Sequence, residues 1–273
     1  FKDYCLTIPT SVVSLTVSET TKSLSILGTE HLTRLALSDQ TSVTLACPKL
    51  REFVWTGWMF SNESIPLPPD HVSRLSSMVI TADLLDPMLE LPPELESLQV
   101  KVNDKLFGVG CFTTLTRLRS LQIKAVTNDD LLDLFALEFL TSLRVSKLGV
   151  SRVPSSLVEC SIVVWADFDF SHCTRLTRLE VALRGDVRLS FPTQLKSLTL
   201  SGEGKLLASN VGSVALVKFH HCSCRMTLEE LEKLPKTLRD VVVLSLNPDS
   251  LKDRLHEVLP CLHSFETLSW LGR

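Results

Sequence analysis

The sequence of 273 residues has a formal net charge of −3, with 44% hydrophobic and 22% charged residues. This apolar content is sufficient for a continuous core and excludes a disordered chain, and the slight acidity argues against a nucleic-acid partner. No apolar run reaches the roughly 18–20 residues that a membrane-spanning helix requires, so we expect no membrane span.

A short pattern of three apolar residues, spaced as apolar-x-x-apolar-x-apolar, recurs along the whole chain. In chain order, the middle apolar residues of these copies are Leu15, Leu35, Phe53, Met78, Leu98, Leu121, Leu143, Cys160, Leu179, Leu198, Val217, Val241 and Leu268. A period near twenty residues indicates stacked structural repeats and not one globular core.

Each copy predicts a short strand whose alternate side chains point to opposite faces. In the copy at Leu95, this alternation places Leu98 and Val100 in the core and Ser97 and Gln99 outside. Because every unit runs in the same direction, we expect about 13 short parallel strands, each followed by a return segment.

The return segments are predicted to be partly extended and partly helical. The 19-residue steps from Leu179 to Leu198 and on to Val217 are too short for a substantial helix. Helices are expected over 128–139, over 227–234 behind a capping box, and over 247–259 behind Asn247-Pro248.

Prolines precede several strands. They are Pro9, Pro92, Pro93, Pro154, Pro192 and Pro235. Because proline fixes φ and favours an extended residue before it, we expect these prolines to end the return segments. Other strands start with Leu-Thr-Arg-Leu, as at Leu32 and Leu176.

These units resemble the leucine-rich repeat superfamily, and the proline-led units are similar to short repeats of bacterial effectors and to irregular protist arrays. The resemblance implies an α/β solenoid over a single domain, 1–273, with the strands on a concave face. We interpret the chain as a fragment of a longer one. The family's turn asparagine or cysteine is matched at Asn103 and Cys222 but not at Thr20, Gln40 or Trp58, which argues against uniform curvature.

The resemblance also implies that a protein partner binds the concave face. The exposed strand positions near its middle are therefore the predicted partner-binding residues. They are Gln99, Gln122, Lys124, Arg144, Arg178 and Glu180. For any one of them, the competing interpretation is an ordinary solvated sheet surface. In the aromatic cluster around Trp55, we expect core packing, with Trp58 or Phe60 as the alternative contact site.

The residues 220–224, His-His-Cys-Ser-Cys, are the right types for zinc. Their spacing is poor, because neighbouring strand residues point to opposite faces, so we predict no metal site and no cofactor. We also expect no catalytic site, because no base and orienting acid accompany Cys222 or Cys224.

The eight cysteines have no disulfide-framework spacing, so we interpret most of them as reduced and buried. This favours a cytoplasmic protein, although the single sequon at Asn62 keeps a secreted recognition ectodomain open as an alternative.

The predicted function is non-catalytic protein–protein interaction through the concave face and adjoining loops. The alternative is the substrate-recognition portion of a ubiquitin-ligase-type protein whose catalytic or adaptor domain lies outside this chain.

Overall fold

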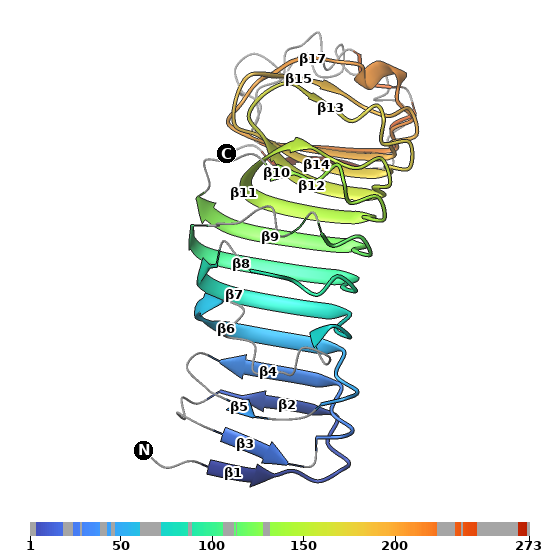
Figure 1. The fold of residues 1–273 in the computed structure, drawn as a ribbon. Helices are drawn as coiled ribbons and strands as arrows, with labels where there is room; N and C mark the ends of the chain where they lie inside the picture. The colour runs from blue at the N-terminus through green and yellow to red at the C-terminus, as the bar shows by residue number, and fades with distance from the viewer. Residues whose placement is uncertain are drawn as a thin grey trace. The chain divides into compact units, whose positions relative to one another are not determined.

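The computed structural model describes residues 4–18, 24–27, 29–38, 43–44, 47–60, 72–86, 89–105, 112, 114–127, 132–222, 233–235, 237–244 and 267–271. It divides into two compact units. Unit 1 comprises Phe1–Asp130 and Ala136–Leu140, and unit 2 comprises Leu131–Phe135 and Thr141–Arg273. Each unit is a parallel β-solenoid in which successive coils stack strand on strand (Figure 1).

Unit 1 contains two parallel sheets. The strands of its long sheet are, in order, β2 (Ser14–Val17), β4 (Arg34–Ser38), β6 (Glu52–Phe60), β7 (Ser77–Leu85), β8 (Ser97–Lys105) and β9 (Ser120–Thr127). Its second sheet contains β1 (Tyr4–Thr7), β3 (Leu24–Leu27) and β5 (Val43–Thr44). The return segments of the first coils therefore pair with one another as strands.

Unit 2 repeats this arrangement. Its long sheet contains β11 (Ser142–Arg152), β12 (Glu159–Val164), β14 (Arg178–Leu183), β16 (Ser197–Gly202), β18 (Lys218–Cys222), β19 (Asp240–Leu244) and β20 (Thr267–Leu271). Its second sheet contains β13 (Phe168–Asp169), β15 (Val187–Ser190) and β17 (Leu206–Ser209). The end of β11 pairs with β10 (Leu132–Asp133), and η3 (Val211–Ser213) follows β17.

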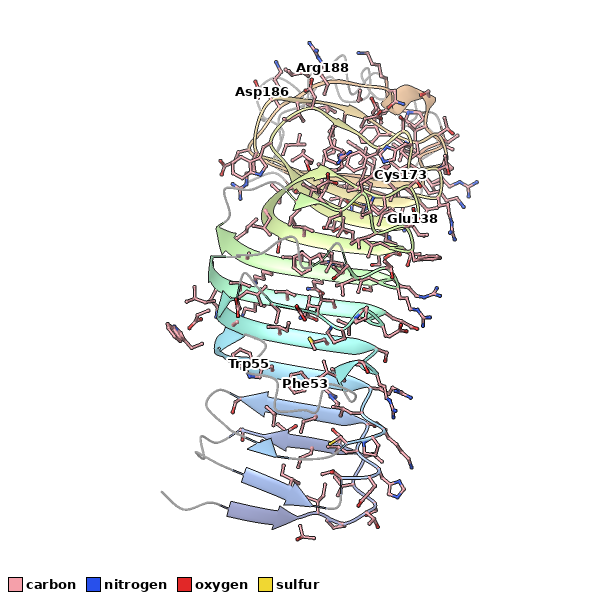
Figure 2. All side chains as sticks on the ribbon, viewed as in Figure 1. Phe53, Trp55, Glu138, Cys173, Asp186 and Arg188 are labelled. Carbon is pink, nitrogen blue, oxygen red and sulfur yellow. The ribbon has the colours of Figure 1, made fainter. Side chains whose placement is uncertain are left out.

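The core of each unit is made of apolar side chains that stack in register from coil to coil. In unit 2, Leu179 lies between Cys160 and Leu198 on neighbouring strands, and all three are buried. In unit 1, Phe53 pairs with Met78, and Trp55 is buried beside Ile80 (Figure 2). Since burying such a side chain contributes about 1.5–3 kcal/mol, the stacked layers are the main source of stability.

At the start of most long strands, a carbonyl accepts two consecutive N–H groups from the next coil. Val158 accepts from the N–H groups of Thr177 and Arg178 at 2.9 and 3.2 Å. The Thr177 hydroxyl donates to the same carbonyl at 3.3 Å, and Thr33 does the same to Val13 at 3.1 Å. This explains the threonine of the Leu-Thr-Arg-Leu strand starts.

The prolines lie in the turns that lead into the strands. The carbonyls of Pro9, Pro92, Pro192 and Pro235 each accept the N–H of the residue three positions later, at 3.0–3.3 Å. Phe112, Cys173 and Val211 make the same bond. The turn therefore accepts residues other than proline, as expected for a simple i to i+3 turn.

The prediction of an α/β solenoid with partly helical returns is wrong for the described residues. There, only η3 and the single positions Val72 and Phe112 are helical. Residues 132–139, predicted as part of a helix, form β10 and tight turns because Leu132 and Leu134 are buried while Asp133 between them is exposed, which is a strand pattern. The helix predicted over 247–259, and all but 233–234 of the one predicted over 227–234, lie outside the described residues.

The predicted register at β18 is also wrong. Phe219, and not Val217, pairs with Leu198 and Val241 as the middle residue. Leu216, expected outside, is therefore fully buried, and His220 takes an outward position. The copy in the structure therefore runs from Leu216 through Phe219 to His221, and it buries the Phe219 ring. The expectation of a single domain over 1–273 is a separate point, and it stays a prediction.

Candidate binding surfaces

Three of the predicted partner-binding residues lie on the long sheet of unit 1. Gln99 on β8 is directly opposite Gln122 on β9, and Lys124 is directly opposite Lys101. Gln99, Lys101 and Lys124 are exposed, and Gln122 is half-buried. Lys101 was missed by the sequence analysis, although it could have been found, because alternation continues beyond Val100 through Lys101 to the buried Val102.

The two lysines form a pair of like charges on neighbouring strands. Among the described residues, neither has an acidic group within the 4.0 Å of an ion pair. Asp83, further along the neighbouring strand β7, instead accepts a hydrogen bond from Asn103 Nδ2 at 2.9 Å. Like charges directly opposite each other on neighbouring strands destabilise a sheet. This patch is therefore a local cost to the fold.

The other three predicted residues lie on the long sheet of unit 2. Arg178 on β14 forms an ion pair with Glu159 on β12, with Nη1 and Oε1 3.2 Å apart. Arg144 is exposed opposite Ser161, which in turn is opposite the half-buried Glu180. The six predicted residues thus divide evenly between the two units, with three on the long sheet of each.

Charged residues at the first outward position of the strands are matched with opposite charges on the next strand. Arg34 pairs with Glu52 at 3.3 Å, and Lys218 pairs with Asp240 at 3.5 Å, as Arg178 does with Glu159. Because these pairs are largely exposed, each contributes at most about 1 kcal/mol. They do, however, leave this row of the face locally neutral.

The histidine and cysteine run at 220–224 is described only in part. His220 lies beside Asp240, with Nε2 and Oδ2 3.9 Å apart, and its Nε2 has no hydrogen-bond partner among the residues that the structure describes. The side chains of His221 and Cys222 and all of 223–224 lie outside the described residues. Among those that are described, no three His, Cys, Asp or Glu side chains come together as metal ligands.

Trp58 is 59% exposed, as in the alternative interpretation of the aromatic cluster, whereas Trp55 is in the core. The Phe60 side chain lies outside the described residues.

Unit 2 also contains a pocket on its return side, which we name the Asp169 pocket. Its volume is about 260 Å³. The lining residues are Phe135, Ser151, Arg152, Val153, Asp167, Phe168, Asp169 and His172. The first four come from the coils of β10 and β11, and the last four come from the coil of β13.

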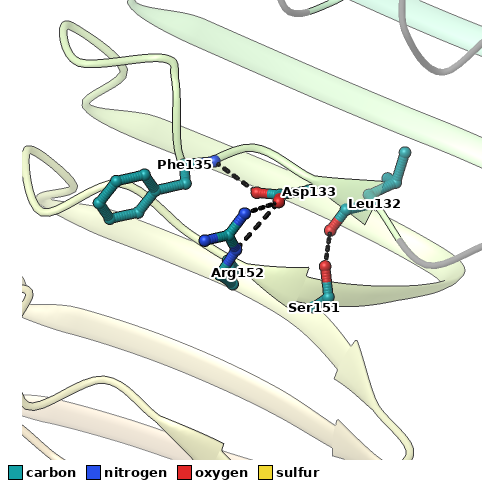
Figure 3. A network of polar contacts seen from close by, with 5 residues as sticks. All are labelled: Leu132, Asp133, Phe135, Ser151 and Arg152. Atoms are coloured by element: carbon teal, nitrogen blue, oxygen red, sulfur yellow. Dashed lines mark hydrogen bonds and ion pairs between the residues drawn. The ribbon is translucent and has the colours of Figure 1, made fainter.

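One wall of the pocket is built around Arg152 (Figure 3). Its Nε donates to Asp133 Oδ2 at 2.9 Å, and its Nη2 donates to the same oxygen. The guanidinium carbon lies 5.4 Å from the centroid of the Phe135 ring, which is 54% exposed. The hydrogen bond from Arg152 lowers the pKa of Asp133. The arrangement is a carboxylate and an aromatic face that together hold one guanidinium.

The opposite wall carries two carboxylates. Asp169 Oδ1 accepts the N–H of Ser171 at 2.8 Å, and the hydrogen bond from the Ser171 side chain is the main reason that the pKa of Asp169 is lowered. Asp167 Oδ1 accepts the N–H of Arg188 at 2.7 Å. Both carboxylates are therefore positioned by backbone groups. His172 Nε2 lies 3.0 Å from the Val153 carbonyl, to which it donates, and this bond joins the two walls.

The Cys173 thiol beside the pocket is buried and disfavoured as a thiolate. Its Sγ lies 3.5 Å from His172 Nε2, but it donates to the Pro154 carbonyl, and burial raises the pKa of Cys173 to about 12. Burial also raises the pKa of Cys47 to about 11 and that of Cys160 further. All three are buried free thiols, as predicted for most of the cysteines.

The sequence analysis did not find this pocket. Its signal is an aspartate between two buried apolar residues on a return segment, as in Leu132-Asp133-Leu134 and Phe168-Asp169-Phe170. Such aspartates accept the N–H two residues later and form a turn.

No helix in the described part of the chain is long and apolar enough to cross a membrane. No protein-family model matches the sequence, and a comparison with curated proteins finds no significant relative.

Proposed function

We propose that the protein is a non-catalytic protein-interaction module of the leucine-rich-repeat type. It binds a protein partner through the outward face of its long sheets and the adjoining loops. The observation that carries the proposal is the pair of exposed lysines, Lys101 and Lys124, opposite each other beside Gln99 and Gln122.

Two features of the chain support this surface over others. The glutamines and lysines lie in register on neighbouring strands of one sheet. This preorganisation favours binding, because the backbone loses little conformational freedom when a partner binds. The lysine pair costs stability in the free protein and would be relieved by an acidic group of a partner. On the face of unit 2, Arg144 is likewise an exposed cation, whereas Arg178 is already paired with Glu159.

The test is the affinity of a partner captured by the wild-type chain and then purified. Titration calorimetry is expected to give at least 10-fold weaker binding for the K101E/K124E double variant. The matched control is R175E/K196E, which makes the same charge change at exposed positions in the turns before β14 and β16. If K101E/K124E binds as tightly as the wild type while remaining folded, the assignment of this face is wrong.

A further inference from the structure

The Asp169 pocket has an excess of negative charge. Arg152 is matched by Asp133, and no lysine or arginine in the described part of the chain forms an ion pair within 4.0 Å with Asp167 or Asp169 on the opposite wall. Arg188 binds Asp167 through its backbone N–H, but no ion pair between their side chains lies within 4.0 Å. Each carboxylate accepts a backbone N–H through Oδ1, and Asp169 also accepts a hydrogen bond from the Ser171 side chain. Because an ionised carboxylate has about four lone-pair sites, both can accept a further donor.

The contact between Asp133 and Arg152 shows which side chain a carboxylate in this kind of turn binds. Asp133 accepts the Phe135 N–H through Oδ1 at 3.1 Å and holds the Arg152 guanidinium through Oδ2. Asp169 repeats the first part of this arrangement with the Ser171 N–H. The residue opposite Asp133 on the neighbouring strand is Arg152, whereas the residue opposite Asp169 is Ser190, which carries no charge. Asp169 is thus a copy of the same carboxylate without its arginine.

The size and the remaining lining favour one side chain over a larger ligand. About 260 Å³ is below the roughly 300–1,000 Å³ of sites for drug-sized molecules. Phe135 at the pocket is more than half exposed, and Phe168 and Val153 provide an apolar wall. A cation over an aromatic face gains about 0.5–1 kcal/mol at exposed sites, and a guanidinium also matches a carboxylate with two parallel hydrogen bonds.

We propose that the Asp169 pocket binds an arginine side chain of a protein partner. The guanidinium lies between Asp169 and the Phe135 ring, while Arg152 stays on Asp133. This site is on the return side of unit 2, formed around β10, the end of β11, and β13, so it does not depend on the proposal for the outward sheet face.

The experiment uses the whole 273-residue chain and a defined probe. N-acetyl-arginine methylamide is titrated into labelled protein, and the amide signals are followed by TROSY NMR. Saturable shifts with a millimolar Kd are expected at 151–153 and 167–172. The citrulline analogue has nearly the same shape without the charge, and it is expected to give no saturable shift.

The variant Asp169→Asn separates charge from structure, because asparagine also accepts a backbone N–H in this kind of turn. It is expected to weaken binding of the arginine probe at least 5-fold. The control is Asp186→Asn, an exposed aspartate that similarly accepts the Lys205 N–H at 3.2 Å, and its Kd should not change. Equal shifts with the citrulline analogue, or an unchanged Kd in folded Asp169→Asn, would overturn the proposal.

Discussion

The long sheet of unit 2 and the return side of the same unit are held together in different ways. On the sheet, the same arrangement repeats from coil to coil. Cys160, Leu179, Leu198 and Phe219 stack in register, and on each strand the residues next to them face outward. On the return side, each coil has its own solution. Asp133 and Asp169 each accept the N–H two residues later, Asn210 binds the Phe191 backbone of the preceding coil, and corners close on glycine. Hydrophobic layers therefore determine the sheet, and individual polar and backbone contacts determine the returns.

The largest effect should come from breaking a layer of the sheet. Phe219→Ala removes a fully buried ring between Leu198 and Val241 and is expected to lower the free energy of unfolding by about 3–5 kcal/mol. Val217→Ala, at a half-buried position, should cost about 1 kcal/mol or less. Urea denaturation compares the two, and a larger loss for Val217→Ala would contradict the register.

A corner of the solenoid gives the next effect. Gly202 has a φ of +102°, and a Cβ there would lie 2.2 Å from the Leu183 carbonyl oxygen. Gly202→Ala is expected to cost about 2–4 kcal/mol, because both the backbone angle and the close approach of the next coil must change. Ser201→Ala is the neighbouring control and should lie within about 0.5 kcal/mol of the wild type. Thermal unfolding followed by circular dichroism measures both variants, and equal values would show that this corner is not constrained.

A single polar contact on the return side should have a smaller effect. Asn210 accepts the Phe191 N–H at 2.7 Å and donates to the Phe191 carbonyl at 2.9 Å. Asn210→Ala removes both bonds and is expected to cost about 1–2 kcal/mol. Asn210→Asp keeps only the acceptor, so it should lower the free energy of unfolding by less than Asn210→Ala does. Urea denaturation measures both variants. If alanine has no effect, side-chain bonds do not hold this return.

The smallest effect is expected on the outward face of the sheet. Arg178→Ala breaks the exposed pair with Glu159 and should cost less than about 1 kcal/mol. Arg144→Ala removes an exposed arginine without such a pair and serves as the control. The difference between the two should disappear in 1 M salt, where the Debye length is about 3 Å. A difference that persists in high salt would mean that the arginine stem, and not its charge, stabilises the strand.

The sequence was a good guide where one periodic rule operates. The spacing around Leu98, Leu121 and Leu179 predicted parallel strands and the polarity of their two faces, because burial alternates strictly along a strand. It gave the wrong register near Phe219. Of the two possible registers, Val214, Val217 and Phe219 fit the apolar pattern fully, whereas the register in the structure places His221 third after Leu216 and Phe219. Only packing against Leu198 decides between them.

The return side could not be predicted in the same way. Local helix signals predicted a helix over 128–139. Instead, Leu132 pairs with Val150 on β11, Leu134 donates its N–H to the Arg152 carbonyl, and both leucines are buried. The Asp169 pocket depends on which aspartate faces an arginine on the next coil, and neighbouring positions in the sequence do not reveal that pairing. The apolar pattern identified outward residues within each copy, such as Gln99. Lys101 lies beyond the end of the pattern, so identifying it required knowing that β8 continues to Lys105.

The most direct measurement of the stacked-coil account is a methyl–aromatic NOE experiment on the layer at Phe219. The account predicts strong contacts from the Leu198 methyl groups to the Phe219 ring on one side and to the Leu179 methyl groups on the other. Contacts from Leu198 to Val217 instead, with a solvent-exposed Phe219 ring, would contradict it.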